Sequence, residues 1–254
     1  MIKQFKVDAV TLESENVVYT GTIKNEPAIC IFPKKSVLQD EFLDVIKEDV
    51  ELKLHNDIYY AYTVKAKVDL KFRLIWPATQ KYFVKYTSKM EFCKETYDDY
   101  IAKRTNEPVV WIENILSGKE EKFRYYEDDK FILMPNYKWT ELSTDDIQLL
   151  LVFKDANLRS IRDISDVTLL EEARSVIIDQ LKHFKLEYKD VILFFHYKPT
   201  YEHLHLHIVH VNLGQTASLS VIRARLLEDV IYNLKLDINY YKRDIWHSQK
   251  KSIK

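Results

Sequence analysis

Three histidines alternate with apolar residues near the carboxyl end of the chain, between His203 and Val209. Side chains on a β-strand point to alternate faces, so a strand here would place His203, His205 and His207 on one face. A single histidine on a strand is usually structural, but three neighbouring imidazoles do not make an apolar core. The pattern therefore predicts a site for a polar ligand.

Two kinds of chemistry fit this cluster. Neutral imidazoles commonly bind zinc, although a catalytic zinc site usually adds a carboxylate or a further histidine from elsewhere. Alternatively, one histidine attacks phosphorus while its neighbours hold the phosphate oxygens and orient the attacking ring. The residues upstream favour phosphate, because Thr200, Tyr201 and backbone amides after the turn at Pro199 can donate to phosphate oxygens. Glu202 would lie on the opposite face of the strand.

The charges of the chain nearly cancel, which limits the partners it can bind. It has 254 residues, with 38 Lys and Arg against 39 Asp and Glu and a net charge of −1. Binding to a long nucleic-acid duplex needs an extended basic surface, so we expect a local pocket instead. The 3 Gly and 6 Pro indicate dense secondary structure.

Cysteine spacing and apolar runs bear on where the protein acts. Cys30 and Cys93 are far apart and form no C-x-x-C pair, which argues against a cysteine zinc site and for a reducing compartment. The longest apolar runs are far shorter than the roughly 20 residues of a membrane span, and the first residues lack a secretory signal. We therefore expect a soluble, cytoplasmic protein without membrane contact, and the sequence leaves nuclear entry open.

The elements that must position the histidines can be read from periodicity. In the first part we predict two strands in 5–32, a helix over 36–48, strands in 50–76 and one helix from Thr79 to about residue 104. We place a domain boundary there, which gives domains 1–104 and 105–254. In the second part we predict a hairpin of 123–126 and 131–134, helices over 143–155 and 167–184, strands 191–197 and 203–211, and a helix over 220–234.

The histidine pattern, His-x-His-x-His followed by two apolar residues, resembles the signature of the histidine triad superfamily of nucleotide hydrolases and transferases. Further stretches resemble one branch, the scavenger mRNA decapping enzyme family. They are Trp-Pro-Ala-Thr at 76–79, the stretch 111–116, Met-Pro-Asn-Tyr-Lys-Trp at 134–139, Leu-Arg-Ser-Ile-Arg-Asp at 158–163, and the segment from His196 through the triad. These stretches occur in order between about residue 54 and the end of the chain.

The resemblance implies an α+β protein with an N-terminal dimerisation and lid domain and a C-terminal histidine-triad domain, whose antiparallel sheet is flanked by helices. It implies hydrolysis of m7GpppN cap dinucleotides and short capped RNA fragments to m7GMP and a nucleoside diphosphate in mRNA decay. The reaction would pass through a covalent nucleotidyl-histidine and need no metal or other cofactor. It also implies a domain-swapped homodimer.

Site residues follow from the same resemblance, position by position. His205 matches the nucleophile, and His203 and His207 match the flanking members that orient it and bind phosphate. Further phosphate-binding positions are matched by His196, Thr200, Tyr201 and Lys138. Tyr59 and Lys85 match residues that reach the substrate when the N-terminal domain closes.

The base pocket can also be argued from physics. N7-methylguanine is cationic, and a cation desolvated against aromatic faces gains about 2 kcal/mol. Trp111 matches the stacking tryptophan, and Glu121 matches a carboxylate that accepts from the guanine N1 and N2 hydrogens. Tyr137 stands where the family carries an aliphatic residue, which predicts a two-aromatic sandwich. Asn136 stands where the family has an aspartate and supplies no charge.

Three alternatives remain open at this point. A general histidine-triad hydrolase of dinucleoside polyphosphates or phosphoramidates would cleave methylated and unmethylated substrates equally. A cap-binding module would bind m7G nucleotides without turnover. A zinc protein would retain metal when purified without chelator.

Overall fold

The computed structural model describes residues 2–12, 16–33, 50–64, 70–87, 90–104, 109–120, 123–139, 143–214 and 217–250. The chain divides into two compact units. The first runs to Glu91 and includes two short further segments, and the second contains most of the chain from Phe92 to Gln249. The sequence predicted a boundary after residue 104, whereas residues 92–104 belong here to the second unit.

The first unit is built on a six-stranded antiparallel sheet of order β1-β2-β3-β6-β5-β4. Its strands are β1 (Lys6–Leu12), β2 (Asn16–Ile23), β3 (Glu26–Pro33), β4 (Val50–Asn56), β5 (Tyr59–Val64) and β6 (Leu70–Ile75). The helix α2 (Gln80–Thr87) follows β6. Alternate residues of β3 bury on opposite faces, with Phe32 in one core cluster and Ile31 in the cluster that includes Tyr86 of α2.

Residues 5–32 form three strands where two were predicted. The turn between β2 and β3 consists of Lys24 and Asn25, whose φ angles are 51° and 66°. Two left-handed residues are what a two-residue hairpin turn requires, and asparagine tolerates this conformation better than most residues. The strands predicted within 50–76 are confirmed, and the helix predicted over 36–48 lies outside the described residues.

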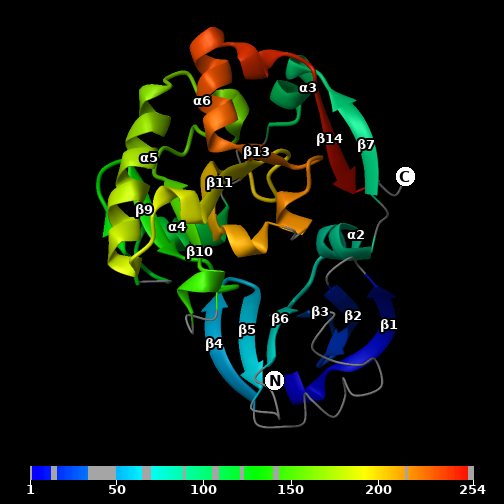
Figure 1. Ribbon diagram of the computed structural model, residues 1–254. Coiled ribbons are helices and arrows are strands. Elements are labelled where there is room, and N and C mark those ends of the chain that lie inside the picture. Colours follow the sequence, from blue (N-terminus) through cyan, green and yellow to red (C-terminus); the bar gives the residue numbers. More distant parts are fainter. Residues whose placement is uncertain are drawn as a thin grey trace. The chain divides into compact units, whose positions relative to one another are not determined.

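The second unit carries a six-stranded antiparallel sheet of order β13-β11-β12-β10-β9-β8. Its strands are β8 (Tyr126–Glu127), β9 (Phe131–Pro135), β10 (Gln148–Phe153), β11 (Val191–His196), β12 (His205–His210) and β13 (Ala224–Leu226). Its helices are α3 (Tyr97–Ala102), α4 (Val110–Leu116), α5 (Thr168–Leu181) and α6 (Leu227–Leu236). A separate ribbon pairs β7 (Met90–Glu95) with β14 (Ile245–Lys250), seen side by side in Figure 1.

The two faces of this sheet pack against different helices. On one face Leu151, Leu206 and Ile208 join a large core cluster with the apolar sides of α5 and α6. On the other face Leu150 and Val152 pack with residues of α4. The α+β class with an antiparallel sheet and flanking helices is confirmed.

The helix predicted over 143–155 is wrong. A single 3-10 turn at Thr144–Asp146 leads into β10, the strand beside β12. Because β10 is buried on both faces, its run of Leu and Val shows no alternation, and such a run is easily mistaken for a buried helix.

The long helix predicted after Thr79 is also wrong, because β7 interrupts it between α2 and α3. The partner of β7 is β14, at the far end of the chain, so local periodicity does not reveal it. Thr96 starts α3 anew through a capping box with Asp99. The predicted helix over 220–234 begins later, at Leu227, because residues 224–226 form β13.

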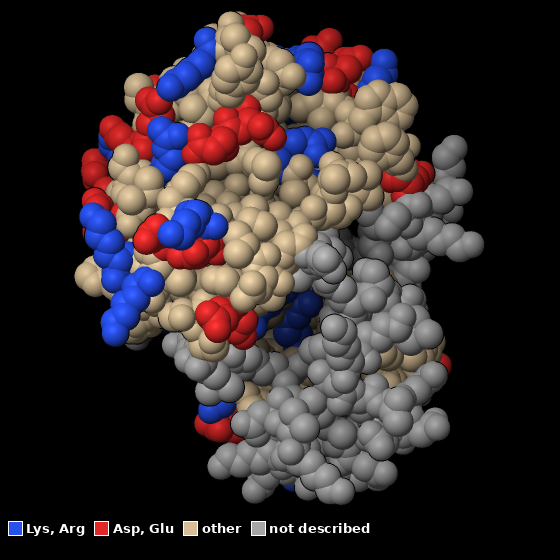
Figure 2. Space-filling model, viewed as in Figure 1, with Lys and Arg blue, Asp and Glu red and all other residues tan. Residues whose placement is uncertain are grey.

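The helix α5 and the strands β11 and β12 are confirmed. The predicted hairpin is also present, but its first strand, β8, begins only at Tyr126, where a strand over 123–126 was predicted. Among the described residues, no helix is long and apolar enough to cross a membrane. Acidic and basic side chains are interspersed on the face of the molecule seen in Figure 2, in keeping with the near-zero net charge.

Candidate active site

The strand β12 separates its residues into a core face and a site face. His205 and His207 lie opposite Val152 and Leu150 of β10, on the face away from the large core. His203 precedes the strand, so the alternation argument holds for the other two histidines only. The ring of His203 is instead fixed by its Nε2, which donates to the carbonyl of Phe153 (2.6 Å).

His205 has the form that a nucleophile needs. Its ring is only 8% exposed, and its Nδ1 donates to the carbonyl oxygen of His203 (2.7 Å). Because a carbonyl only accepts, the proton of the neutral ring is on Nδ1 and the lone pair is on Nε2. Burial lowers the pKa of His205 to about 4, with smaller contributions from the charges of His203 and Arg223. The ring is therefore neutral at physiological pH.

His196 and His207 complete a cluster of three rings. The centroids of these two rings are 4.4 Å apart, and His207 also stacks on Phe194. The Nε2 of His196 donates to the carbonyl of Ser218 (2.9 Å). Burial lowers the pKa of His196 to about 2, and it lowers that of His207 well below the ordinary value. Both rings are thus neutral.

The Nε2 of His207 is buried and has no hydrogen-bond partner among the described residues. A buried polar atom without a partner costs free energy, which a bound acceptor or donor would offset. One ring nitrogen from each of His196, His205 and His207 lies within 4.8 Å of the other two. This cluster could hold phosphate oxygens or a metal ion, and no described carboxylate or thiol belongs to it.

Two cations act on the histidines. Lys138, in the turn after β9, contributes to the lowered pKa values of His196 and His207 through its charge. Arg223 contributes to the lowered pKa of all three rings, and its Nη2 donates to the Oγ1 of Thr200 (2.7 Å). Sequence reasoning missed Arg223, because it lay within a stretch predicted as helix, where an isolated arginine is usually a solvated charge.

The segment predicted to bind phosphate and the tryptophan predicted to stack on the base meet in this unit. The rings of Trp111 and Tyr201 are in edge contact, with centroids 4.9 Å apart and an interplanar angle of 71°. Trp111 extends from α4 and packs against the cluster that contains Leu150. The sheet therefore brings Trp111, which lies far from the histidines in the sequence, to the same face as His205 and His207, where it contacts Tyr201.

The turn after β9 presents the other base-pocket candidates. Asn136 is half-buried, and its Oδ1 accepts from the backbone N–H of Lys138 (3.1 Å). Tyr137 is 41% exposed, so its ring is accessible to a ligand. Trp139 closes the turn by donating its backbone N–H to the carbonyl of Asn136 (2.8 Å).

Three predicted residues are not brought to this cluster by the described structure. Glu121 lies outside the described residues. Tyr59 and Lys85 belong to the first unit, where the Tyr59 hydroxyl donates to that of Tyr82 (3.0 Å), and the side chain of Lys85 on α2 is not described. Their roles stay predictions.

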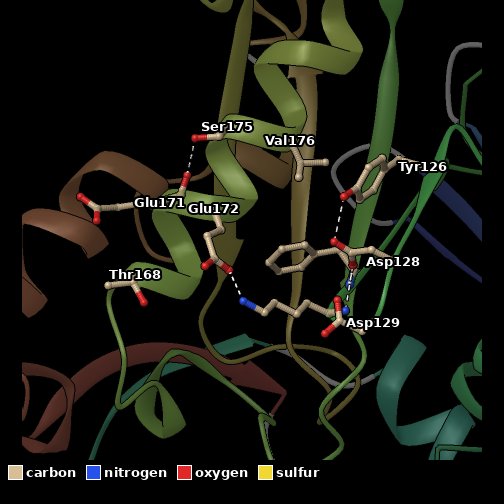
Figure 3. A pocket seen from close by; sticks show the side chains of 10 residues that line it. Tyr126, Asp128, Asp129, Thr168, Glu171, Glu172, Ser175 and Val176 are labelled. Atoms are coloured by element: carbon tan, nitrogen blue, oxygen red, sulfur yellow. Dashed lines mark hydrogen bonds and ion pairs between the residues drawn. The ribbon is translucent and has the colours of Figure 1, made fainter.

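A separate pocket lies between α5 and the hairpin of β8 and β9 (Figure 3). It is lined by four carboxylates, which are those of Asp128, Asp129, Glu171 and Glu172. The hydroxyl of Tyr126 donates to Asp128 (2.8 Å). Negative lining disfavours a phosphate ligand, and none of the three clustered histidines lines this pocket. The candidate for phosphate chemistry is therefore the histidine cluster.

Known protein families and individual proteins match most of this chain. A family profile described as "Scavenger mRNA decapping enzyme (DcpS) N-terminal" matches residues 1–89, and one described as "Scavenger mRNA decapping enzyme C-term binding" matches residues 110–220. The m7GpppX diphosphatase of Ascaris suum is 35% identical over 75% of this chain and 69% of its own length. That of Schizosaccharomyces pombe is 29% identical over 92% and 87%, and that of Rattus norvegicus 30% over 88% and 72%.

Proposed function

The chain belongs to the scavenger mRNA decapping enzyme family, and from this membership we propose that it is an m7GpppX diphosphatase that acts in mRNA decay. It hydrolyses m7GpppN cap dinucleotides and short capped RNA fragments to m7GMP and a nucleoside diphosphate. The observation that carries the proposal is His205: a buried, neutral imidazole whose Nε2 carries the lone pair, lies beside two further histidines and is near the Arg223 guanidinium.

In the first step, the Nε2 lone pair of His205 attacks the phosphorus nearest methylguanosine. A nitrogen–phosphorus bond forms as the bond to the bridging oxygen breaks, and the nucleoside diphosphate leaves with that electron pair. The hydrogen bond from Nδ1 to the carbonyl of His203 stabilises the charge that develops on the ring.

In the second step, water attacks the nucleotidyl-histidine. The nitrogen–phosphorus bond breaks, its electrons return to Nε2 of His205, the water oxygen stays on phosphorus as m7GMP, and the proton that the water loses passes to solvent. Negative charge on the transferring group is offset by Arg223 and Lys138, and His207 offers its unpartnered Nε2 to a phosphate oxygen. These donors can serve without a metal ion.

Methylguanine recognition is assigned to Trp111 and Tyr137 as aromatic faces for the cationic ring. The contact between Trp111 and Tyr201 supports this assignment, because it joins the base pocket to the phosphate segment. Asn136 offers an uncharged hydrogen bond, and Glu121 would supply the carboxylate that pairs with the guanine edge.

The first unit serves as a dimerisation and lid domain in this proposal. Tyr59 and Lys85 would reach the substrate when it closes, which would also exclude long capped RNA. The family resemblance implies a domain-swapped homodimer, which we include in the proposal. Light scattering of the purified protein would detect a dimer.

The test of function uses m7GpppG and GpppG in parallel, with EDTA present, and separates the nucleotides by chromatography. We expect m7GMP and GDP, formed much faster from the methylated substrate. Equal cleavage of both would favour a general histidine-triad hydrolase, and tight binding without cleavage would favour a sequestering module. A His205→Asn variant should lose turnover and keep cap binding.

A metal-binding function is the second candidate, because His196 joins His205 and His207 within 4.8 Å. A catalytic zinc site usually takes three protein ligands, and His196 would be the third beside the two histidines of β12. Metal analysis of protein purified without chelator, combined with loss of activity in EDTA, would favour this candidate over the metal-independent reaction.

A further inference from the structure

A buried charged cluster includes Tyr197, the residue that follows His196 in the segment assigned to phosphate binding. Arg162 is 1% exposed, Glu95 2% and Tyr197 0%. The Nε of Arg162 donates to the hydroxyl of Tyr197 (2.5 Å), and that hydroxyl donates to Glu95 Oε2. Buried charges are tolerated only when they are paired and hydrogen-bonded, so this cluster is under strong geometric constraint.

The two Nη atoms of Arg162 also donate hydrogen bonds. Arg162 Nη2 donates to the backbone carbonyl of Glu95 (2.9 Å), and Nη1 donates to that of Arg243 (3.0 Å). Its carbon also lies 5.2 Å from the centroid of the Tyr197 ring. Five donors in a rigid fork allow one side chain to join three chain segments, which a lysine could not do.

Glu95 is the counter-charge of the cluster. Burial raises the pKa of its carboxyl, but the hydrogen bond from Tyr197 and the charge of Lys198 lower it, and the net shift is downward. Lys198 Nζ lies 3.1 Å from Glu95 Oε1. The ionised carboxylate therefore binds both Tyr197 and its neighbour Lys198.

Tyr197 connects this cluster to the site. It follows His196 directly in the chain, and its backbone N–H donates to the carbonyl of Arg223 (2.8 Å). Arg223 in turn donates to Thr200. The hydroxyl of Tyr197 is thus fixed in the cluster while its backbone fixes two groups assigned to phosphate.

We propose that Arg162 and Glu95 are positioning residues, which hold Tyr197 and through it place His196 and Arg223 against the phosphate attacked by His205. The inference rests on the proposed function and deepens it, because it assigns a role to two residues outside the cluster of His196, His205 and His207. A displacement of reacting groups by about 1 Å can cost a hundredfold in rate.

Tyr197→Phe tests the proposal, because it removes only the hydroxyl that joins Arg162 to Glu95. Tyr188→Phe is the matched control: its hydroxyl also donates to a glutamate, Glu228 (2.5 Å), but at a surface site. We expect kcat for m7GpppG to fall by about tenfold to a hundredfold in Tyr197→Phe, while KM changes little, since the misplaced groups act on charge that develops in the transition state. The control should keep its kcat.

A second pair guards against a simple loss of folding. Glu95→Gln keeps the shape of the side chain and removes its charge, and Glu228→Gln is its surface control. Thermal unfolding is measured for all four variants. If Tyr197→Phe and Glu95→Gln keep kcat within about twofold of their controls, whatever their Tm, the cluster is only structural and the inference is overturned.

Failure of the proposed function gives a different result. It would appear as absence of m7GpppG cleavage by the unaltered protein in the same assay. The positioning role is then read from binding of 7-methylguanosine with orthovanadate, which mimics the transition state at phosphorus, followed by tryptophan fluorescence. Weaker binding by Tyr197→Phe than by Tyr188→Phe would support the inference, and equal binding would overturn it.

Discussion

The neutral state of His205 has a direct consequence for the pH dependence of the reaction. Only the neutral ring attacks phosphorus, and burial lowers its pKa to about 4. A solvated imidazole with a pKa of about 6.5 would be roughly 9% neutral at about pH 5.5, against roughly 97% for a pKa of about 4. Because the pKa is lowered, activity should persist on acidification and be lost only as the pH falls through about 4.

The difference is large enough to measure. Between about pH 7 and about pH 5.5, an enzyme with a solvated nucleophile would lose about eightfold in kcat/KM, whereas this one should lose less than about twofold. The ratio kcat/KM is the right quantity, because it reports the free enzyme before substrate phosphates alter the pKa values.

The assay uses initial rates at m7GpppG concentrations below KM, in buffers of constant ionic strength. Each sample is returned to neutral pH afterwards, and full recovery of activity shows that no unfolding occurred. A decline of about eightfold with a midpoint near pH 6.5 would refute the reasoning, since it would mean that the nucleophile titrates like a solvated imidazole.

Three further predictions follow from the same unit. The folded pKa of His205 lies below the unfolded value of about 6.5, so the stability that the neutral ring contributes is present above that pH and is lost as the pH falls toward 4. Urea unfolding at about pH 5 should therefore show a loss of about 2 kcal/mol in the free energy of unfolding, and the His205→Asn variant should lack this loss. Arg223→Met should lower kcat by about a hundredfold, while Arg225→Met, whose guanidinium donates to backbone carbonyls, should not. Leu206→Ala in the core should cost about 2–5 kcal/mol of unfolding free energy in denaturant titration, and Leu236→Ala, 65% exposed, under about 0.5.

Sequence reasoning was more reliable for the histidine strand than for the elements around it. The histidine strand was readable because its two faces differ in polarity, and alternation is a local signal. The neighbouring strand β10 was not readable, because both of its faces are buried and local pattern then gives no preference between strand and helix. The pairing of β7 with β14 depends on residues about 150 positions apart, which no local window contains.

Two residues with proposed roles, Arg223 and Glu95, were missed because the elements around them were predicted wrongly. Arg223 reaches the histidines only because its segment ends the sheet beside β11 instead of starting a helix. Arg162 was noticed as part of a stretch resembling the family, but its partner Glu95 was placed inside a helix that does not exist. The role of a charged residue depends on the segments that it contacts, and here those segments are far apart in the sequence.

His203 shows how a correct pattern can still assign a residue the wrong geometry. The alternation places it beside His205, but its backbone N–H bonds to the carbonyl of Tyr201 (2.8 Å) and the chain joins β12 only at His205. Its carbonyl, which any residue would provide, sets the tautomer of the nucleophile. The imidazole of His203 acts one step further back, since its bond to Phe153 anchors the segment that offers this carbonyl. The first histidine of the pattern therefore orients the second through its backbone, and in the proposed reaction only the later two would present their rings to phosphate.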